Sequence, residues 1–256
     1  MYYAKAKQFI DDFLAKNQLS ELSKTVHKNL HYCLDYDIFH IEDETEEPLG
    51  ISKLYGLPHL PDSIDFPPDM LFLGQFNCAE IKPFDIFNRF PEKGILYFFV
   101  DETGTETECF FYDGPVEDLK ICPYPDPEDP ESFLEDQEEY IESAYTISFD
   151  DTELCILSRG WEESFGDMSL IFIDELKQFF GDKILIIGHD EYYEFPDDFI
   201  FGAPRFWQDE EKDENQEMLL CFKFTEEGNI NYFVEDGTLD PNKDVCEQIE
   251  GIYSGT

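Results

Sequence analysis

From residue 50 onward the chain consists of short apolar runs between glycine, proline and acidic residues, and this pattern limits what it can fold into. The runs MLFLGQF (70–76), GILYFFV (94–100) and CFFYD (109–113) have the length and aromatic content of β-strands. Later runs of the same kind are AYTISF, ELCILS, KILIIG, MLLCFKF and NINYFV. The pattern predicts a mainly antiparallel β structure built from many short strands.

Residues 1 to about 34 differ, because their apolar residues recur at the spacing of a helix. The residues that share this stripe are Phe9, Ile10, Phe13, Leu14, Leu19, Leu22, Val26 and Leu30. We therefore expect an α+β fold, with N-terminal helices followed by an internally duplicated, mainly antiparallel β unit. The predicted organisation is a single compact domain over residues 1–256, with a helical segment at 1–48 and β-rich halves at 49–150 and 151–256.

Two ungapped alignments within the chain indicate the duplication. Residues 54–60 align with residues 200–206, so that Gly56 matches Gly202 and Pro58 matches Pro204. Residues 94–101 align with residues 228–235, and here Gly94 matches Gly228. An apolar strand lies between the anchors in both copies, and three matches in the same order are stronger than any one alone.

The charge of the chain excludes several classes of partner. Sixty acidic residues against 17 Lys and Arg give a net charge of −43. Direct binding to nucleic acid or to an anionic membrane surface needs clustered basic residues, and neither is expected here. Disorder is also excluded, because 42% of the residues are hydrophobic and 16% are aromatic. The acids concentrate at 42–47, 126–142 and 209–217, which we interpret as solvated loops and faces.

No catalytic residue, metal site or cofactor is predicted. The chain contains no GxGxxG, no GxxxxGK[ST] and no GxSxG sequence. Its seven cysteines are odd in number, widely spaced and without a CxxC pair, as expected for buried reduced thiols in a cytoplasmic protein. The first residues do not resemble a signal peptide, and no apolar run is long enough to span a membrane.

A few residues are candidates for binding. Gln75 is the one polar residue in a strongly apolar strand, where a buried amide needs partners. It either orients a ligand at the junction of the two halves or ties down the turn at 56–61, and the structural role is favoured. His189 follows a strand, where a ligand-binding histidine or an ordinary loop histidine is found. Arg205, Phe206 and Trp207 form either a contact for a protein partner or part of the core.

Four segments resemble the YwqG-like family, bacterial proteins classed as a domain of unknown function. These segments are KLYGLPHLP (53–61), LGQFN (73–77), FPEKGILYFF (90–99) and GAPRFWQ (202–208). The family usually has a Leu-Leu-x-Gln strand where this chain has LLCF (219–222), and a Trp-Gly-Asp-x-Gly turn where this chain has EEG (226–228). The resemblance implies an α+β fold with internal duplication and an immunity or interaction role, without an established reaction.

Two functions are consistent with these features. The first is a protein-binding module, an immunity or inhibitor protein that captures a basic partner such as a toxin, because runs of acids steer cationic proteins. The second is a small-ligand-binding protein or enzyme with a site between the duplicated halves, where pockets are often found. The first is favoured, and no oligomeric state follows from the sequence.

Overall fold

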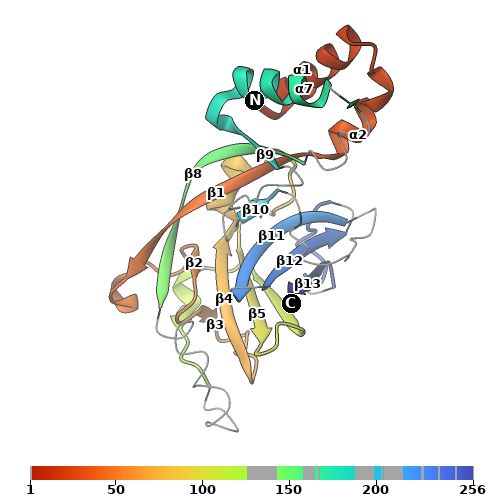
Figure 1. Ribbon diagram of the computed structural model, residues 1–256. Coiled ribbons are helices and arrows are strands. Elements are labelled where there is room, and N and C mark those ends of the chain that lie inside the picture. Colours follow the sequence, from red (N-terminus) through yellow and green to blue (C-terminus); the bar gives the residue numbers. More distant parts are fainter. Residues whose placement is uncertain are drawn as a thin grey trace. The chain divides into compact units, whose positions relative to one another are not determined.

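The chain forms two compact units, each made of two separate stretches of sequence. Unit 1 comprises Met1–Asp35 and Asp151–Pro204, and unit 2 comprises Tyr36–Asp150 and Arg205–Thr256. Figure 1 shows the helices and strands of the computed structural model. The structure describes residues 2–125, 143–157, 165–166, 168–187, 199–202, 204, 216–225, 228–235, 237–245 and 247–255.

Unit 1 has a helical core formed by α1 (Tyr2–Lys16), α2 (Ser23–Lys28) and α7 (Met168–Phe180). The short helices η1 (Ser20–Leu22) and η5 (Gly181–Lys183) adjoin them in sequence. The helical stripe predicted for α1 is confirmed: Ile10, Phe13 and Leu14 are buried, and they belong to one apolar cluster with Phe172 and Leu176 of α7. Burial of such stripes, rather than helix propensity, stabilises helices of this length.

Among the described residues, four strands contribute to unit 1, and two of them also supply residues to unit 2. Strand β8 (Ala144–Leu157) pairs in parallel with β9 (Ile184–Ile187). Strand β1 (Leu30–Ile41) pairs in antiparallel fashion with β10 (Phe199–Phe201), where Leu34 faces Ile200.

The helical segment is thus shorter than the predicted residues 1–48, because α2 ends at Lys28 and a twelve-residue strand begins at Leu30. That strand, LHYCLDYDIFHI, is rich in Tyr, Phe, Ile and His. Aromatic and β-branched residues favour a strand. The helical pattern of apolar residues therefore ends at Leu30, where this strand begins.

Unit 2 contains an antiparallel meander of β4 (Met70–Asn77), β5 (Ile95–Asp101) and β6 (Thr107–Tyr112). The two-residue strand β2 (Lys53–Leu54) joins β4 to β8. Strand β3 (His59–Pro61) pairs with β7 (Leu119–Ile121) in a separate small sheet. The short helices of this part are η2 (Glu44–Glu46), α3 (Cys78–Ile81), η3 (Lys82–Phe84) and η4 (Val116–Asp118).

A second meander in unit 2 consists of β11 (Gln216–Thr225), β12 (Gly228–Glu235) and β13 (Ile249–Gly255), which lie side by side in Figure 1. Its rings pack on those of the first meander: Phe222 lies 5.8 Å from Phe76 and 5.8 Å from Phe98, between ring centroids. Phe98 also contacts Tyr232 at 4.8 Å. All four rings are fully buried. The predicted mixed fold with an N-terminal helix and mostly antiparallel strands is confirmed.

The two meanders are irregular at equivalent positions. Strand β4 has a register shift between Phe72 and Gly74 against β5, and β11 has one between Met218 and Leu220 against β12. In the alignment that matches Gly94 with Gly228, the residues facing one register shift match the residues facing the other. The residues that face the shifts are Phe99 and Phe98 in one meander and Phe233 and Tyr232 in the other.

The aligned glycine turns share an uncommon backbone conformation. Tyr55 and Gly56 have φ values of 54° and 65°, and Phe201 and Gly202 have φ values of 64° and 81°. Left-handed φ is costly for a bulky aromatic residue, so it persists only where the surrounding structure requires it. Tyr55 aligns with Phe201 in the ungapped match, and the same strained pair therefore occurs twice.

The six described cysteines form no disulfide, and five of them are buried, whereas Cys122 is half-buried. The prediction of buried reduced thiols is met by these five, and Cys246 lies outside the described residues. Among the described residues, no helix combines the length and the apolar character needed to cross a membrane.

Candidate functional site

A buried polar cluster surrounds Gln75 in unit 2. Gln75 lies on β4, is fully buried, and accepts a hydrogen bond at Oε1 from the backbone N–H of His59 at 2.8 Å. Its Nε2 donates to the carbonyl of Ile51 at 2.8 Å. The bond from His59 lies within the turn at 56–61 that the structural interpretation of Gln75 names, and the bond to Ile51 lies outside it. A ligand-binding role for Gln75 stays a prediction.

His59 is the second member of the cluster and is also fully buried. Its Nδ1 accepts a hydrogen bond from the N–H of Gly50 at 3.0 Å, which places the ring proton on Nε2. That Nε2 is buried and has no hydrogen-bond partner among the described residues. The hydroxyl of Tyr97 donates to the carbonyl of His59 at 2.7 Å and fixes the backbone of β3.

An ion pair completes the cluster. Lys53, on β2, is 1% exposed, and its ammonium donates to the Glu44 carboxylate and to the carbonyl of Leu57 at 2.9 Å. Both carboxylate oxygens of Glu44 accept from the N–H of Leu57 at 3.1 Å. Burial lowers the pKa of Lys53, and the hydrogen bond and charge of Glu44 oppose that shift. Glu44 therefore favours the charged form of the buried ammonium and at the same time holds the turn at 55–57.

Gly56 is required at that turn for reasons of space as well as of backbone conformation. A Cβ atom on Gly56 would lie 2.6 Å from Glu44 Oε1 and 2.7 Å from Ala144 Cβ. The Glu44 carboxylate consequently sits where any other side chain would be. The turn glycine, the carboxylate and the buried lysine form one interdependent arrangement.

The cluster combines a neutral imidazole, an ammonium and a carboxylate, which are groups used in acid–base chemistry. Here, however, most of their hydrogen bonds go to the backbone of residues 50–59. The arrangement therefore fixes the path of this segment over β4. Within the described part of the chain, no three His, Cys, Asp or Glu side chains are grouped so that they could hold a metal ion.

The other predicted site residues lie outside the described residues. These are His189, Arg205, Phe206 and Trp207. The glycines and prolines of the predicted structural motif are described: Pro58 accepts a hydrogen bond from Cys122, Gly94 precedes β5, Pro204 is half-buried and Gly228 begins β12.

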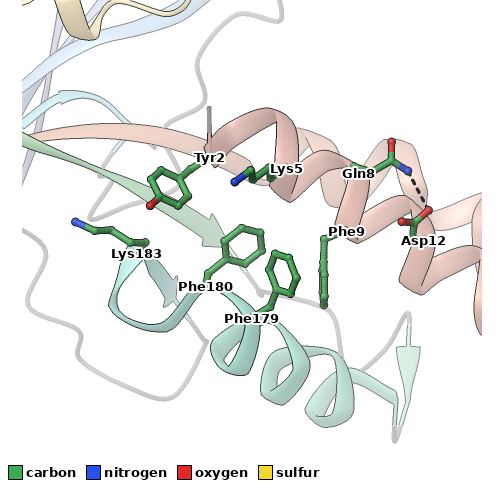
Figure 2. Close-up of a pocket in the computed structure, with 8 residues that line it drawn as sticks. All are labelled: Tyr2, Lys5, Gln8, Phe9, Asp12, Phe179, Phe180 and Lys183. Atoms are coloured by element: carbon green, nitrogen blue, oxygen red, sulfur yellow. Dashed lines mark hydrogen bonds between the residues drawn. The ribbon is translucent and has the colours of Figure 1, made fainter.

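Unit 1 contains a pocket between α1 and α7, which the sequence analysis missed. Figure 2 shows the rings of Phe9, Phe179 and Phe180 facing one another between the two helices. Tyr2 and Lys183 lie toward one end of this row of rings in the view, and Gln8 and Asp12 lie toward the other. The spacing of Tyr2, Lys5, Phe9 and Asp12 places them on one side of a helix. From this helical spacing, the α1 wall of the pocket could have been predicted.

A comparison with family models matches residues 52–239. The chain belongs to the family described as Domain of unknown function (DUF1963). The DUF1963 match contains Lys53, His59 and Gln75, but it begins after Glu44 and after the whole of α1. A comparison with curated proteins finds no match.

We expect His59 to make the protein less stable as the pH falls. Burial, with a smaller effect of the nearby Lys53 charge, lowers the pKa of His59 from 6.5 to about 4. The unfolded chain therefore binds the proton first, and the loss runs from about pH 6.5 down to about pH 4. It amounts to about 2 kcal/mol between pH 7 and pH 5.

Urea unfolding followed by far-ultraviolet circular dichroism at these two pH values measures this loss. In the His59→Gln variant the residue no longer titrates, so its free energy of unfolding should fall about 2 kcal/mol less over this range. Equal losses in the wild type and the variant would contradict the assignment of this pH dependence to His59.

Proposed function

We propose that the chain is a protein-binding module whose unit 2 captures a basic protein. The observation that carries this proposal is the unequal division of charge between the units. Unit 2 holds 43 of the 60 acidic residues and only nine of the 17 basic ones, a net charge of −34. Unit 1 has a net charge of −9. A field of this sign and size raises the association rate of a cationic protein.

Strand β6 and the loops on both sides of it are the surface that we assign to the partner. Strand β6 ends the strand order among the described residues. The exposed acids of this surface, which we call the β6 surface, are Glu102, Glu106, Glu108, Asp113, Glu117 and Asp118. Val116 lies among them and is 46% exposed, so an apolar contact is available inside a charged rim. This combination is found at protein interfaces.

An immunity or inhibitor protein that neutralises a basic toxin fits this surface, and we infer a cytoplasmic location for it. The alternative, a ligand or catalytic site between the duplicated halves, gains no support from the packing. The rings of Phe76, Phe98, Phe222 and Tyr232 fill the space between the two meanders of unit 2.

We further infer that the chain is internally duplicated and that it is YwqG-like within the DUF1963 family. The register shifts at equivalent positions of β4 and β11 support the duplication. The left-handed Tyr55–Gly56 and Phe201–Gly202 pairs support it independently. In the aligned register Cys221 takes the place of Gln75, so the second copy lacks the amide that organises the first.

The proposed function is tested by recovering a partner from the native cell and measuring its association. The wild type should retain a basic protein at about 50 mM salt and release it at about 500 mM, because screening is strong there. The triple variant Glu106→Gln, Glu108→Gln, Glu117→Gln should slow association of the purified partner about tenfold.

The matched control is the triple variant Glu42→Gln, Glu46→Gln, Asp65→Asn. It removes three exposed acids of unit 2 that are not among the six acids of the β6 surface, and the association rate should fall about twofold or less. Failure to recover any basic protein at low salt would count against the function. Equal slowing by both triple variants would count against the β6 surface as the contact.

A further inference from the structure

The pocket between α1 and α7 has the size and lining of a small-molecule site. Its volume is about 640 Å³, which lies within the range of pockets that hold small ligands. Helix α1 supplies one wall, and the end of α7 with η5 supplies the other. Both walls belong to unit 1, so the pocket is formed within one compact body.

The apolar wall is a cluster of three phenylalanine rings. The centroid of Phe9 lies 4.8 Å from that of Phe179 and 5.8 Å from that of Phe180, and Phe179 lies 4.8 Å from Phe180. Phe180 is buried, whereas Phe179 is 59% exposed. Tyr2 adds a ring that is 46% exposed. An apolar molecule in the pocket would cover ring surface that water now contacts, which is favourable.

The polar lining carries a positive excess. Lys5 and Lys183 line the pocket, and the ammonium of Lys5 lies 5.7 Å from the centroid of the Tyr2 ring. The acid of the lining is Asp12, and its carboxylate accepts a hydrogen bond from Gln8 at 2.9 Å (Figure 2). Two lysines against one aspartate contrast with a chain in which acids outnumber basic residues by more than three to one.

We propose that this pocket binds a small organic carboxylate with an apolar body. The body lies against Phe9, Phe179 and Phe180, and the carboxylate lies near Lys5. A neutral apolar molecule gains the ring contacts alone, and a cationic one is repelled by Lys5. The net charge of the chain repels anions at long range, so affinity comes from these local contacts.

Three naphthalene probes with different head groups test the choice of ligand. They are 2-naphthoate, 2-naphthalenemethanol and 2-naphthylmethylamine, each titrated into the full chain by calorimetry. We expect 2-naphthoate to bind about fivefold more tightly than the neutral probe and more tightly still than the amine. Decanoate, titrated in the same way, shows whether the pocket accepts an acyl body as well as an aromatic one. Binding of either carboxylate more tightly than the neutral and the cationic probe supports the proposal.

Variants of exposed residues locate the binding. Phe179→Ser should weaken carboxylate binding about tenfold and Lys5→Gln about threefold, because each removes one of the two kinds of contact. The controls are Leu170→Ser, an apolar residue on α7 that is 65% exposed, and Lys7→Gln on α1. Neither control residue lines the pocket, and both variants should bind within about twofold of the wild type.

Three outcomes would overturn the proposal. They are no heat of binding for either carboxylate, equal affinity for the anionic and cationic naphthalenes, and equal weakening by Phe179→Ser and Leu170→Ser. The circular dichroism spectrum of each variant, compared with the wild type, separates loss of binding from loss of fold. None of these readouts depends on the β6 surface.

Discussion

Replacing Glu44 with glutamine is expected to lower the free energy of unfolding by about 3 kcal/mol, because it leaves the ammonium of Lys53 buried without its counter-charge. Lys53 is 1% exposed, so water cannot replace the lost carboxylate. Glutamine has the shape of glutamate, and the change therefore removes charge with little change in volume. Urea unfolding at pH 7 measures the effect.

Two comparisons assign the loss to the buried charge. Lys53→Met removes the ammonium itself, and it should cost less than Glu44→Gln because Glu44 keeps its hydrogen bonds from Leu57 and is 19% exposed. Lys120→Met breaks an ion pair with Asp62 whose side chains are 66% and 84% exposed, and it should cost at most about 0.5 kcal/mol. A Glu44→Gln variant as stable as Lys120→Met would contradict the buried pair.

Substitution of Gly56 by alanine is the second change with a large expected effect, again about 3 kcal/mol. Part of this cost is the left-handed backbone, with φ at 65°, which alanine tolerates poorly. The rest is the overlap of the new methyl group with Glu44 Oε1 at 2.6 Å and Ala144 Cβ at 2.7 Å. The methyl group displaces the carboxylate and so also weakens its pairing with Lys53.

Gly237 provides a matched control in the same unit. Its φ is 76°, but a Cβ atom there meets only Glu217 Cγ, at an ordinary contact distance of 3.5 Å. Gly237→Ala should therefore cost about 1 kcal/mol, the backbone part alone. Urea unfolding of both variants gives the difference, and equal losses would mean that the Gly56 turn has room for a side chain.

Much of the β structure was predictable from local sequence, because strand-sized apolar runs between turn residues leave few alternatives. The runs at 70–76, 94–100 and 109–113 correspond to β4, β5 and β6. AYTISF and residues 153–157 of ELCILS, in contrast, belong to one strand, β8. The acidic pair Asp150–Asp151 between them resembles a turn in sequence. A strand can nevertheless continue through such a pair when the residues before it and the residues after it are both paired with neighbouring strands.

The buried cluster was less predictable, because its partners are distant in sequence. Gln75 stood out as one polar residue in an apolar strand. Lys53 and Glu44 did not: a lysine next to a turn and an acid within a run of acids are both ordinarily solvated. Only the fold brings them together, and it takes Glu44 out of an acidic loop that the sequence indicates to be solvated throughout. The pocket of unit 1 was missed for a similar reason, since its two walls lie more than 160 residues apart.

The position of Glu44 affects where the smallest autonomous piece of this chain can begin. The family match starts at residue 52, and a fragment cut there would keep the Lys53 ammonium and discard the carboxylate that neutralises it. Asp43, which accepts hydrogen bonds from Thr45 and so shapes the short helix carrying Glu44, would also be lost. We therefore expect a fragment intended to retain the first β-rich half to be more stable when it begins before Asp43 than when it begins at residue 52.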